Sequence, residues 1–237
     1  MAGWGVPSYA PIVDAAGAWG EQKVPIIKSG MTAVFSMHAT KALGCGEGGY
    51  IVTWDEGAAQ EYRAMSNFGF NSRCSYGINA KMSEIHAAFA LAALDQWDRE
   101  PWLQLDGWYR RHLPESVIQQ DRPPGVYPIL SVKLPCHAQP ALERMKELGV
   151  ECRRWYTPTV DHNPLFDAPR PKEGAMGGHK RPELARKVHL PVTMDLEQHL
   201  LGLPYHLWLT EDDVKEVCEK LAQVVEEQTE KEVATAS

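Results

Sequence analysis

Two side chains near the start of the chain have types and positions that could do chemistry together. Lys41 follows the apolar run Ala33–Phe35 and precedes a glycine-rich segment, Gly44–Gly49, while Asp14 closes an earlier apolar pair, Ile12–Val13. A lysine amine can form a Schiff base with an aldehyde, and an acid at a strand end can keep a pyridine nitrogen protonated. A protonated pyridine ring is an electron sink. These are the two protein groups that pyridoxal phosphate (PLP) chemistry needs most.

Each of these residues also has a simpler interpretation. A single lysine is usually a solvated surface charge, and Asp14 alone would serve equally well as a cap or turn residue. Their shared setting changes the balance, because each lies just beyond an apolar strand and ligands of parallel sheets bind at the carboxyl ends of strands. The Gly44–Gly49 segment lacks the spacing of a phosphate loop and is equally well explained as a flexible turn. The pair Asp14 and Lys41 therefore predicts one shared site.

Further candidates carry weaker signals. Asn79 has the setting of a turn asparagine, and His86 that of a core or surface histidine. A basic stretch late in the chain is most simply a solvated loop, although it could also clamp a phosphorylated substrate. Its members are Arg170, Lys172, His179, Lys180 and Arg181.

Apolar patterning predicts the elements that position the first pair. Ile12–Val13 and Ala33–Phe35 are typical of buried, parallel strands, and a third strand is expected over 50–53. Asp55 is expected to cap a helix running to about residue 67, with Tyr62 and Met65 inward, and Ser83 to cap a second helix. The second helix would gather four apolar residues on one face: Ile85, Ala88, Phe89 and Ala92.

The pattern changes near Pro101, where we place a domain boundary. Three strands are too few for a sheet with both faces covered, so the first part of the chain is an incomplete unit. In the later part, the pattern predicts a strand over 126–134, a helix over 140–148 and a strand over 150–155. A mobile loop is expected over 167–181. A final helix is expected to begin at Thr210 and to fray after about Glu226. The expected buried side of that last helix is Val214, Val217, Leu221, Val224 and Val225.

Composition excludes several classes of protein. The chain has 237 residues, 44% of them hydrophobic and 23% charged, and a net charge of -7. Such a chain has no general attraction to nucleic acid or to an anionic membrane. No apolar run is long enough to span a bilayer, and no signal peptide is expected. The 5 cysteines are scattered without a CxxC pair, which predicts reduced thiols in a cytoplasmic protein and no zinc or other metal site.

Six segments in order resemble the DegT/DnrJ/EryC1/StrS family of PLP-dependent sugar aminotransferases. The resemblance covers nearly the whole chain. It includes a strand ending in the pyridine-binding aspartate, a Schiff-base segment with the following Gly-Glu-Gly-Gly, a Gly-x-Asn-x-Lys-Met segment, an Arg-x-Tyr-x-Pro stretch and two late Leu-Pro motifs. The segments are 11–16, 35–49, 67–84, 154–158, 190–193 and 203–206.

The resemblance implies an α/β, type I aminotransferase-like fold, with a partial PLP-binding large domain over 1–100 and a small α+β domain over 101–237. By analogy, Lys41 binds PLP covalently and shuttles a proton, Asp14 pairs with the pyridinium, Ser36 binds the phosphate, and Asn79 reaches the phosphate in a neighbouring subunit. The implied substrate is a keto group on a nucleotide-linked sugar, as in polysaccharide or antibiotic sugar biosynthesis, with glutamate or glutamine as amino donor.

Three departures from the family pattern leave alternatives open. Gly17 replaces a residue that contacts the ring hydroxyl, Lys81 replaces an arginine, and the family's long N-terminal part is absent. The chain could be an aminotransferase completed by a companion N-terminal half, as a homodimer or hetero-oligomer. It could instead be a truncated, non-catalytic binding or assembly subunit, or a fragment of a full-length enzyme. Lys41 argues against the family's dehydratases, which carry histidine there.

Overall fold

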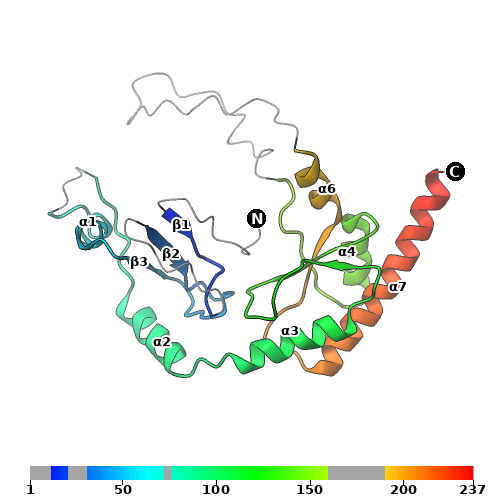
Figure 1. The fold of residues 1–237 in the computed structure, drawn as a ribbon, viewed down its shortest axis with the longest axis horizontal. Coiled ribbons are helices and arrows are strands. Elements are labelled where there is room, and N and C mark those ends of the chain that lie inside the picture. The colour runs from blue at the N-terminus through cyan, green and yellow to red at the C-terminus, as the bar shows by residue number, and fades with distance from the viewer. Residues whose placement is uncertain (1–11, 21–30, 72–75, 160–189, 237) are drawn as a thin grey trace, which may run out of the picture. The chain divides into compact units, whose positions relative to one another are not determined.

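The computed structural model describes residues 12–20, 31–71, 76–159 and 190–236 (Figure 1). The chain divides into two compact units that interleave along the sequence. Unit 1 contains residues 1–111, 122–130 and 205–214, and unit 2 contains residues 112–121, 131–204 and 215–237. The predicted boundary near Pro101 stays a prediction, and the loop expected over 167–181 lies outside the described residues.

Unit 1 is built around the three strands that the sequence predicts. They are β1 (Ile12–Asp14), β2 (Thr32–Ser36) and β3 (Gly49–Thr53), and β2 lies between the other two (Figure 1). Strand β1 runs parallel to β2, as expected, whereas β3 runs antiparallel to it. The antiparallel step places the connection between β2 and β3, and with it Lys41, at the carboxyl end of β2.

One face of this sheet is more buried than the other. Alternate side chains of a strand point to opposite faces, and Val13, Ala33 and Phe35 form a core cluster on the first face. On the second face Ile12 and Val34 are exposed. The expectation that β1 and β2 are buried strands is therefore wrong for this face, because the described part of the chain places little over it.

Two capped helices follow the sheet, as predicted. Helix α1 (Glu56–Ser66) is capped by Asp55, whose carboxylate accepts a hydrogen bond from the amide of Ala58 at 2.9 Å. Tyr62 of α1 points inward, and its hydroxyl lies 3.4 Å from that of Thr32. Helix α2 (Glu84–Asp95) is capped by Ser83. Its predicted apolar face is exposed to solvent: Ile85, Ala88, Phe89 and Ala92.

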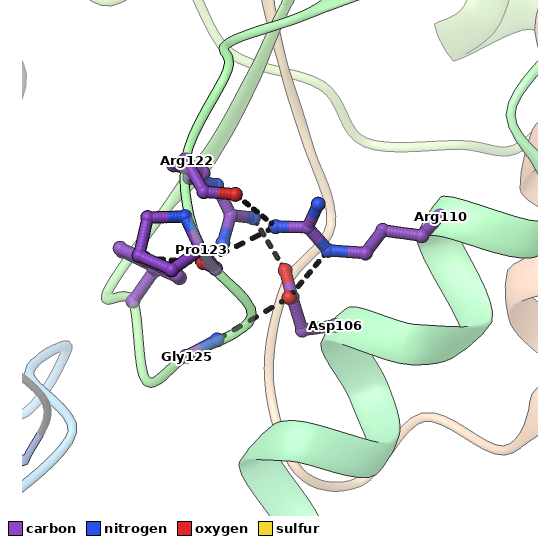
Figure 2. A network of polar contacts seen from close by, with 6 residues as sticks. Asp106, Arg110, Arg122, Pro123 and Gly125 are labelled. Atoms are coloured by element: carbon purple, nitrogen blue, oxygen red, sulfur yellow. Dashed lines mark hydrogen bonds and ion pairs between the residues drawn. The ribbon is translucent and has the colours of Figure 1, made fainter.

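Helix α3 (Glu100–His112) begins where the sequence indicated only an interruption. Pro101 stands in its first turn, where the missing amide hydrogen costs nothing. Asp106 of α3 is buried between two guanidinium groups, those of Arg110 and Arg122 (Figure 2). This network joins α3 to the segment that follows Arg122 within unit 1. In the same unit, the rings of Trp102 and Tyr109 pack against the ring of Tyr205.

Unit 2 contains a second small sheet, in the order β4-β5-β6. Strand β4 (Ile118–Gln119) pairs antiparallel with β5 (Leu130–Lys133), and β6 (Leu200–Leu203) completes the sheet. Strand β5 is shorter than the predicted strand over 126–134. The strand predicted over 150–155 is wrong, because there the chain forms only an isolated bridge between Arg153 and Gly202.

Helices cover the sheet of unit 2. Helix α4 (Ala138–Glu147) confirms the predicted helix, with its proline in the first turn, and α6 (Pro191–His199) was not predicted. Helix α7 (Glu211–Ala236) opens with the predicted capping box, in which Thr210 and Asp213 bond each other's amides. All five side chains predicted for its buried side are buried. The expected fraying after Glu226 is wrong, since α7 continues to Ala236.

The four described cysteines are free thiols: Cys45, Cys136, Cys152 and Cys218. Burial raises the pKa of Cys152 and of Cys218 to about 12, so both thiols stay protonated at neutral pH. Among the described helices, none combines the length and apolar character that crossing a bilayer requires. The described residues also hold no cluster of His, Cys, Asp and Glu that could bind a metal ion.

Candidate active site

Lys41 lies in an ordered connection between β2 and β3. The backbone amide of Ala39 donates to the carbonyl of Gly46 at 2.8 Å, and the amide of Cys45 donates to the carbonyl of Met37 at 2.9 Å. The amide of Lys41 donates to the carbonyl of His38, also at 2.9 Å, which closes a turn around the lysine. These bonds hold the glycine-rich segment in one conformation and fix where the Lys41 side chain begins.

The glycines of this segment are required for two different reasons. Gly46 and Gly48 have φ values of +101° and +144°, a region that side chains with a Cβ rarely adopt. Gly44 instead lies against backbone: a Cβ there would be 2.8 Å from the carbonyl oxygen of Ala39 and 2.9 Å from that of His38. The segment is therefore a closely packed support for the lysine turn.

The inner side of α2 supports the same turn, which the sequence did not reveal. The His86 ring lies 3.3 Å from the position a Cβ would take on Gly46, and the ring nitrogen Nδ1 lies 2.7 Å from the hydroxyl of Ser83. Met82 packs against Gly48. The available signal was helical spacing within α2, because His86 and Ala90 stand four residues apart, whereas Met82 precedes the helix. The cluster of Met37, Leu43 and Cys45 is packed by Trp19, Tyr50, Met82, Ala90, Ala93 and Trp97.

The Lys41 side chain is half-buried, and among the described residues no hydrogen bond or ion pair engages its amine. Its neighbours are held by other contacts. The Nδ1 atom of His38 lies 2.9 Å from the hydroxyl of Thr40, and the His38 Nε2 atom lies 3.8 Å from the carboxylate of Glu47. An amine that no described residue engages, on an ordered turn, can react with an aldehyde.

Asp14 and Ser36 lie on the same face of the sheet, at neighbouring strand ends. Asp14 is in register with Val34, and Ser36 follows two residues later, about 7 Å further along β2. The Asp14 carboxylate is exposed and accepts a hydrogen bond from the amide of Ala16 at 3.0 Å. The Ser36 hydroxyl accepts one from the amide of His38 at 3.2 Å. Strand pairing thus brings Asp14, Ser36 and the Lys41 turn to the same end of the sheet, where β1 and β2 finish.

Asn79 belongs to a different segment. It forms a bridge with Asn67 after α1, and its side-chain oxygen accepts a hydrogen bond from the Lys81 amine at 2.6 Å. The same amine lies 4.2 Å from the centre of the Phe68 ring. No described contact connects Asn79 to Lys41 or Asp14, so its role in binding a phosphate stays a prediction.

The residues at this edge fit PLP. A half-buried amine without a partner can bind the aldehyde, an exposed carboxylate at a strand end can pair with a ring nitrogen, and the Ser36 hydroxyl still has its hydrogen to donate to a phosphate. Tyr50 faces the opposite side of the sheet, where it stacks on Phe35 with ring centres 4.7 Å apart. Burial raises the pKa of Tyr50 to about 12, so this tyrosine is a neutral structural group.

Comparison with known proteins agrees with this chemistry. The model of the DegT/DnrJ/EryC1/StrS aminotransferase family matches residues 10–222, so this chain belongs to that family. It is 28% identical over 165 residues to dTDP-4-amino-4,6-dideoxy-D-glucose transaminase of Shigella dysenteriae, covering 63% of this chain and 45% of that protein. It is 30% identical over 188 residues to dTDP-3-amino-3,4,6-trideoxy-alpha-D-glucose transaminase of Streptomyces venezuelae, covering 70% of this chain and 46% of that protein.

Solved structures confirm the predicted fold class. DesI, crystallised in the presence of its TDP-sugar product, superposes with a TM-score of 0.75 at 27% identity, over 95% of this chain and 58% of DesI. A family aminotransferase from Brucella abortus gives a TM-score of 0.70 at 21% identity, over 90% of this chain and 56% of that one. The chain has part of a PLP-dependent aminotransferase fold, and it spans about half the length of the curated relatives it matches.

We expect Gly44→Ala to lower the free energy of unfolding by ~1–3 kcal/mol, because the new methyl group would press on two backbone carbonyl oxygens. Gly107→Ala is the matched control. It lies in the interior of α3 with nothing within 4 Å of the added Cβ, so it should raise that free energy by about 0.5–1 kcal/mol. Urea denaturation of both variants measures the difference. Equal effects of the two substitutions would show that the Lys41 turn is not packed as described.

Proposed function

We propose that this chain provides the lysine-bearing part of an active site for PLP-dependent amino transfer to a keto group of a nucleotide-linked sugar. The observation that carries the proposal is the convergence of Asp14, Ser36 and the Lys41 turn on one edge of the sheet. Family membership supports it, because two of the similar relatives are named as transaminases of dTDP-linked sugars.

Each residue has a distinct task in this proposal. Bound PLP would supply an electron sink next to the substrate carbon that exchanges its keto group for an amine. The Lys41 amine would hold the cofactor covalently and then move a proton at that carbon. The Asp14 carboxylate would keep the ring nitrogen protonated, and the Ser36 hydroxyl would donate to the phosphate.

The names of the relatives support the proposed class of substrate. The Shigella and Streptomyces transaminases are named for dTDP-linked sugars, and DesI was crystallised with a TDP-sugar product. We infer a nucleotide-linked keto sugar as amino acceptor and glutamate or glutamine as donor. We also infer that Asn79, held by Lys81, reaches a phosphate in a neighbouring subunit. We also infer a cytoplasmic location, because the four described cysteines are buried free thiols.

The complete enzyme is proposed to need the N-terminal part of the family fold, supplied by a companion polypeptide. Two observations support the need for that part of the fold: the chain covers 58% of DesI, and the Asp14 face of its sheet is exposed. A second candidate is a non-catalytic binding or assembly subunit. The exposed apolar residues of unit 1, Phe89 among them, favour this candidate, because exposed apolar patches often mark a surface that binds another protein.

The test is the absorption spectrum of the purified chain with PLP, followed by borohydride reduction and peptide mapping. We expect a visible band and a reduced cofactor locked on the peptide that contains Lys41. A screen of nucleotide-linked keto sugars with glutamate or glutamine then measures amino transfer by the assembled protein. A label scattered over surface lysines, with and without the companion polypeptide, would contradict the proposed site.

A further inference from the structure

Two aromatic rings and a cation gather on the segment that connects α1 to α2. The Lys81 amine lies 4.2 Å from the centre of the Phe68 ring and donates a hydrogen bond to the side-chain oxygen of Asn79 at 2.6 Å. The Phe68 and Phe70 rings have centres 6.0 Å apart and planes inclined by 57°. We call Phe68, Phe70, Asn79 and Lys81 the Phe68 cluster. All four side chains are exposed, the two rings by 55% and 66%.

The backbone that carries the Phe68 cluster is held in place. The amide of Phe68 donates to the carbonyl of Ile78 at 2.9 Å, and the amide of Ile78 donates to the carbonyl of Met65 at 2.8 Å. A Cβ on Gly77 would overlap the backbone nitrogen of Gly69, so the two glycines let two chain segments touch directly. The exposed rings are therefore displayed from a fixed backbone.

Phe68 adopts a backbone conformation that a bulky residue rarely takes. Its φ is +60°, in the left-handed region, where a side chain with a Cβ raises the free energy of the chain. Burial of the ring does not offset this strain, because more than half of the residue is exposed. Strained residues of this kind are concentrated at binding sites. The conformation of Phe68 therefore points to a ligand for its ring.

We propose that the Phe68 cluster binds the nucleoside diphosphate part of the substrate, with the base stacked on Phe70 and the diphosphate on the Lys81 amine. The identity of the ligand rests on the proposed function, whose substrate is a nucleotide-linked sugar. Aromatic rings are general platforms for nucleic-acid bases, because every base has a flat π face. The Phe70 ring is chosen for the base because the Lys81 amine already lies over the Phe68 ring.

The charge of the Phe68 cluster suits a diphosphate. The whole chain carries a net charge of -7, so an anionic ligand needs a cation at its binding site. The Lys81 ammonium has three hydrogens, and Asn79 engages one of them, which leaves others for phosphate oxygens. Because Asn79 uses its oxygen for Lys81, its amide nitrogen is left for the cofactor phosphate inferred above.

Calorimetric titration of the full chain with thymidine diphosphate tests the Phe68 cluster. Phe70→Ala and Phe68→Gly should each weaken binding about 5- to 150-fold, the loss expected when a base loses a stacking partner. Glycine adopts a φ of +60° without strain, so Phe68→Gly should keep the fold, which circular dichroism checks. Trp208→Ala is the matched control, since Trp208 is an aromatic residue of unit 1 with an exposed fraction of 92%. It should leave the affinity unchanged.

Inorganic pyrophosphate separates the base from the diphosphate. Pyrophosphate should bind more weakly than thymidine diphosphate, and Phe70→Ala should not change its affinity. Lys81→Ala should weaken the binding of both ligands and make it less dependent on salt. No binding of thymidine diphosphate at millimolar concentration, or equal affinities of pyrophosphate and thymidine diphosphate, would overturn the proposal. Equal affinities of Phe70→Ala, Phe68→Gly and Trp208→Ala for thymidine diphosphate would overturn it as well.

The titration and the trapping of PLP report on different sites. Phe70→Ala should still trap PLP on Lys41 with borohydride while it binds thymidine diphosphate more weakly. If the unchanged chain traps PLP on Lys41 but does not bind thymidine diphosphate, the assignment of the Phe68 cluster fails and the proposed cofactor site stands. If it binds thymidine diphosphate through Phe70 but traps no PLP on Lys41, the assignment of the Phe68 cluster stands and the proposed cofactor site fails.

Discussion

Replacing Lys41 with alanine should abolish covalent attachment of PLP and lower amino transfer by the assembled protein on the order of 10³-fold or more, because the proposed function makes Lys41 both the proton-transfer group and the covalent anchor of the cofactor. The reason is local. The ordered β2–β3 connection presents the Lys41 amine with no partner among the described residues, and it follows Ser36 at the end of β2. Borohydride reduction followed by peptide mapping measures the attachment directly.

Lys81→Ala is the matched control for this experiment. Lys81 is also a lysine of unit 1 close to a proposed cofactor-binding residue, but its amine is engaged by Asn79 and lies over the Phe68 ring. The Lys81→Ala variant should therefore still trap PLP on Lys41. If trapping survives in Lys41→Ala, or disappears in Lys81→Ala, the assignment of Lys41 as the covalent anchor is wrong.

Asp106→Ala should lower the free energy of unfolding by ~3–5 kcal/mol, because it leaves a buried guanidinium without its counter-charge. The exposed fractions of the Asp106 and Arg122 side chains are 0% and 4%, and their closest charged atoms are 2.5 Å apart. Arg110 contacts the same carboxylate at 2.8 Å and also donates to the carbonyl oxygens of Arg122 and Pro123 (Figure 2). Urea denaturation measures the loss.

The control for Asp106 is a surface ion pair of the same unit. Arg111 and Glu211 also approach to 2.5 Å, but their side chains are 65% and 40% exposed. Glu211→Ala should therefore change the free energy of unfolding by no more than ~1 kcal/mol. Asp106→Asn keeps the shape of the side chain and one acceptor oxygen, so we expect it to lower the free energy of unfolding by an intermediate amount. It replaces Asp106→Ala in the measurement if the alanine variant does not fold. Similar losses for Asp106→Ala and Glu211→Ala would show that the buried network does not stabilise unit 1.

The sequence predicted correctly those helix starts and strands that depend on a single short segment. The caps Asp55 and Ser83 define the starts of α1 and α2, and the Thr210 capping box defines that of α7, because the atoms involved are within a few residues of one another. The three strands around Asp14 and Lys41 were predicted for the same reason: each is a short apolar run bounded by turn residues.

Predictions failed where a distant segment decides the outcome. The end of α7 is held by α4 and the residue before it. The Glu227 carboxylate pairs with Arg144 at 2.9 Å, and the Glu232 carboxylate accepts a hydrogen bond from the backbone amide of His137 at 2.8 Å. The bond from that amide helps to hold the pKa of Glu232 below its usual range. Likewise, the chain near Arg153 meets β6 at a single bridge, which periodicity within 150–155 cannot reveal.

The sequence by itself determined the chemical groups, the family and the local elements that carry them, because residue types and short-range spacing are properties of one segment. The sequence predicted a shared site for Asp14 and Lys41, but only the tertiary structure decided the strand register that sets Asp14 and Ser36 on one face of the sheet, since strand pairing joins segments far apart in the chain. The tertiary structure alone also decided which apolar residues remain exposed. Val34 and Phe35 are equally apolar neighbours, and only the packing around β2 buries Phe35 and leaves Val34 open.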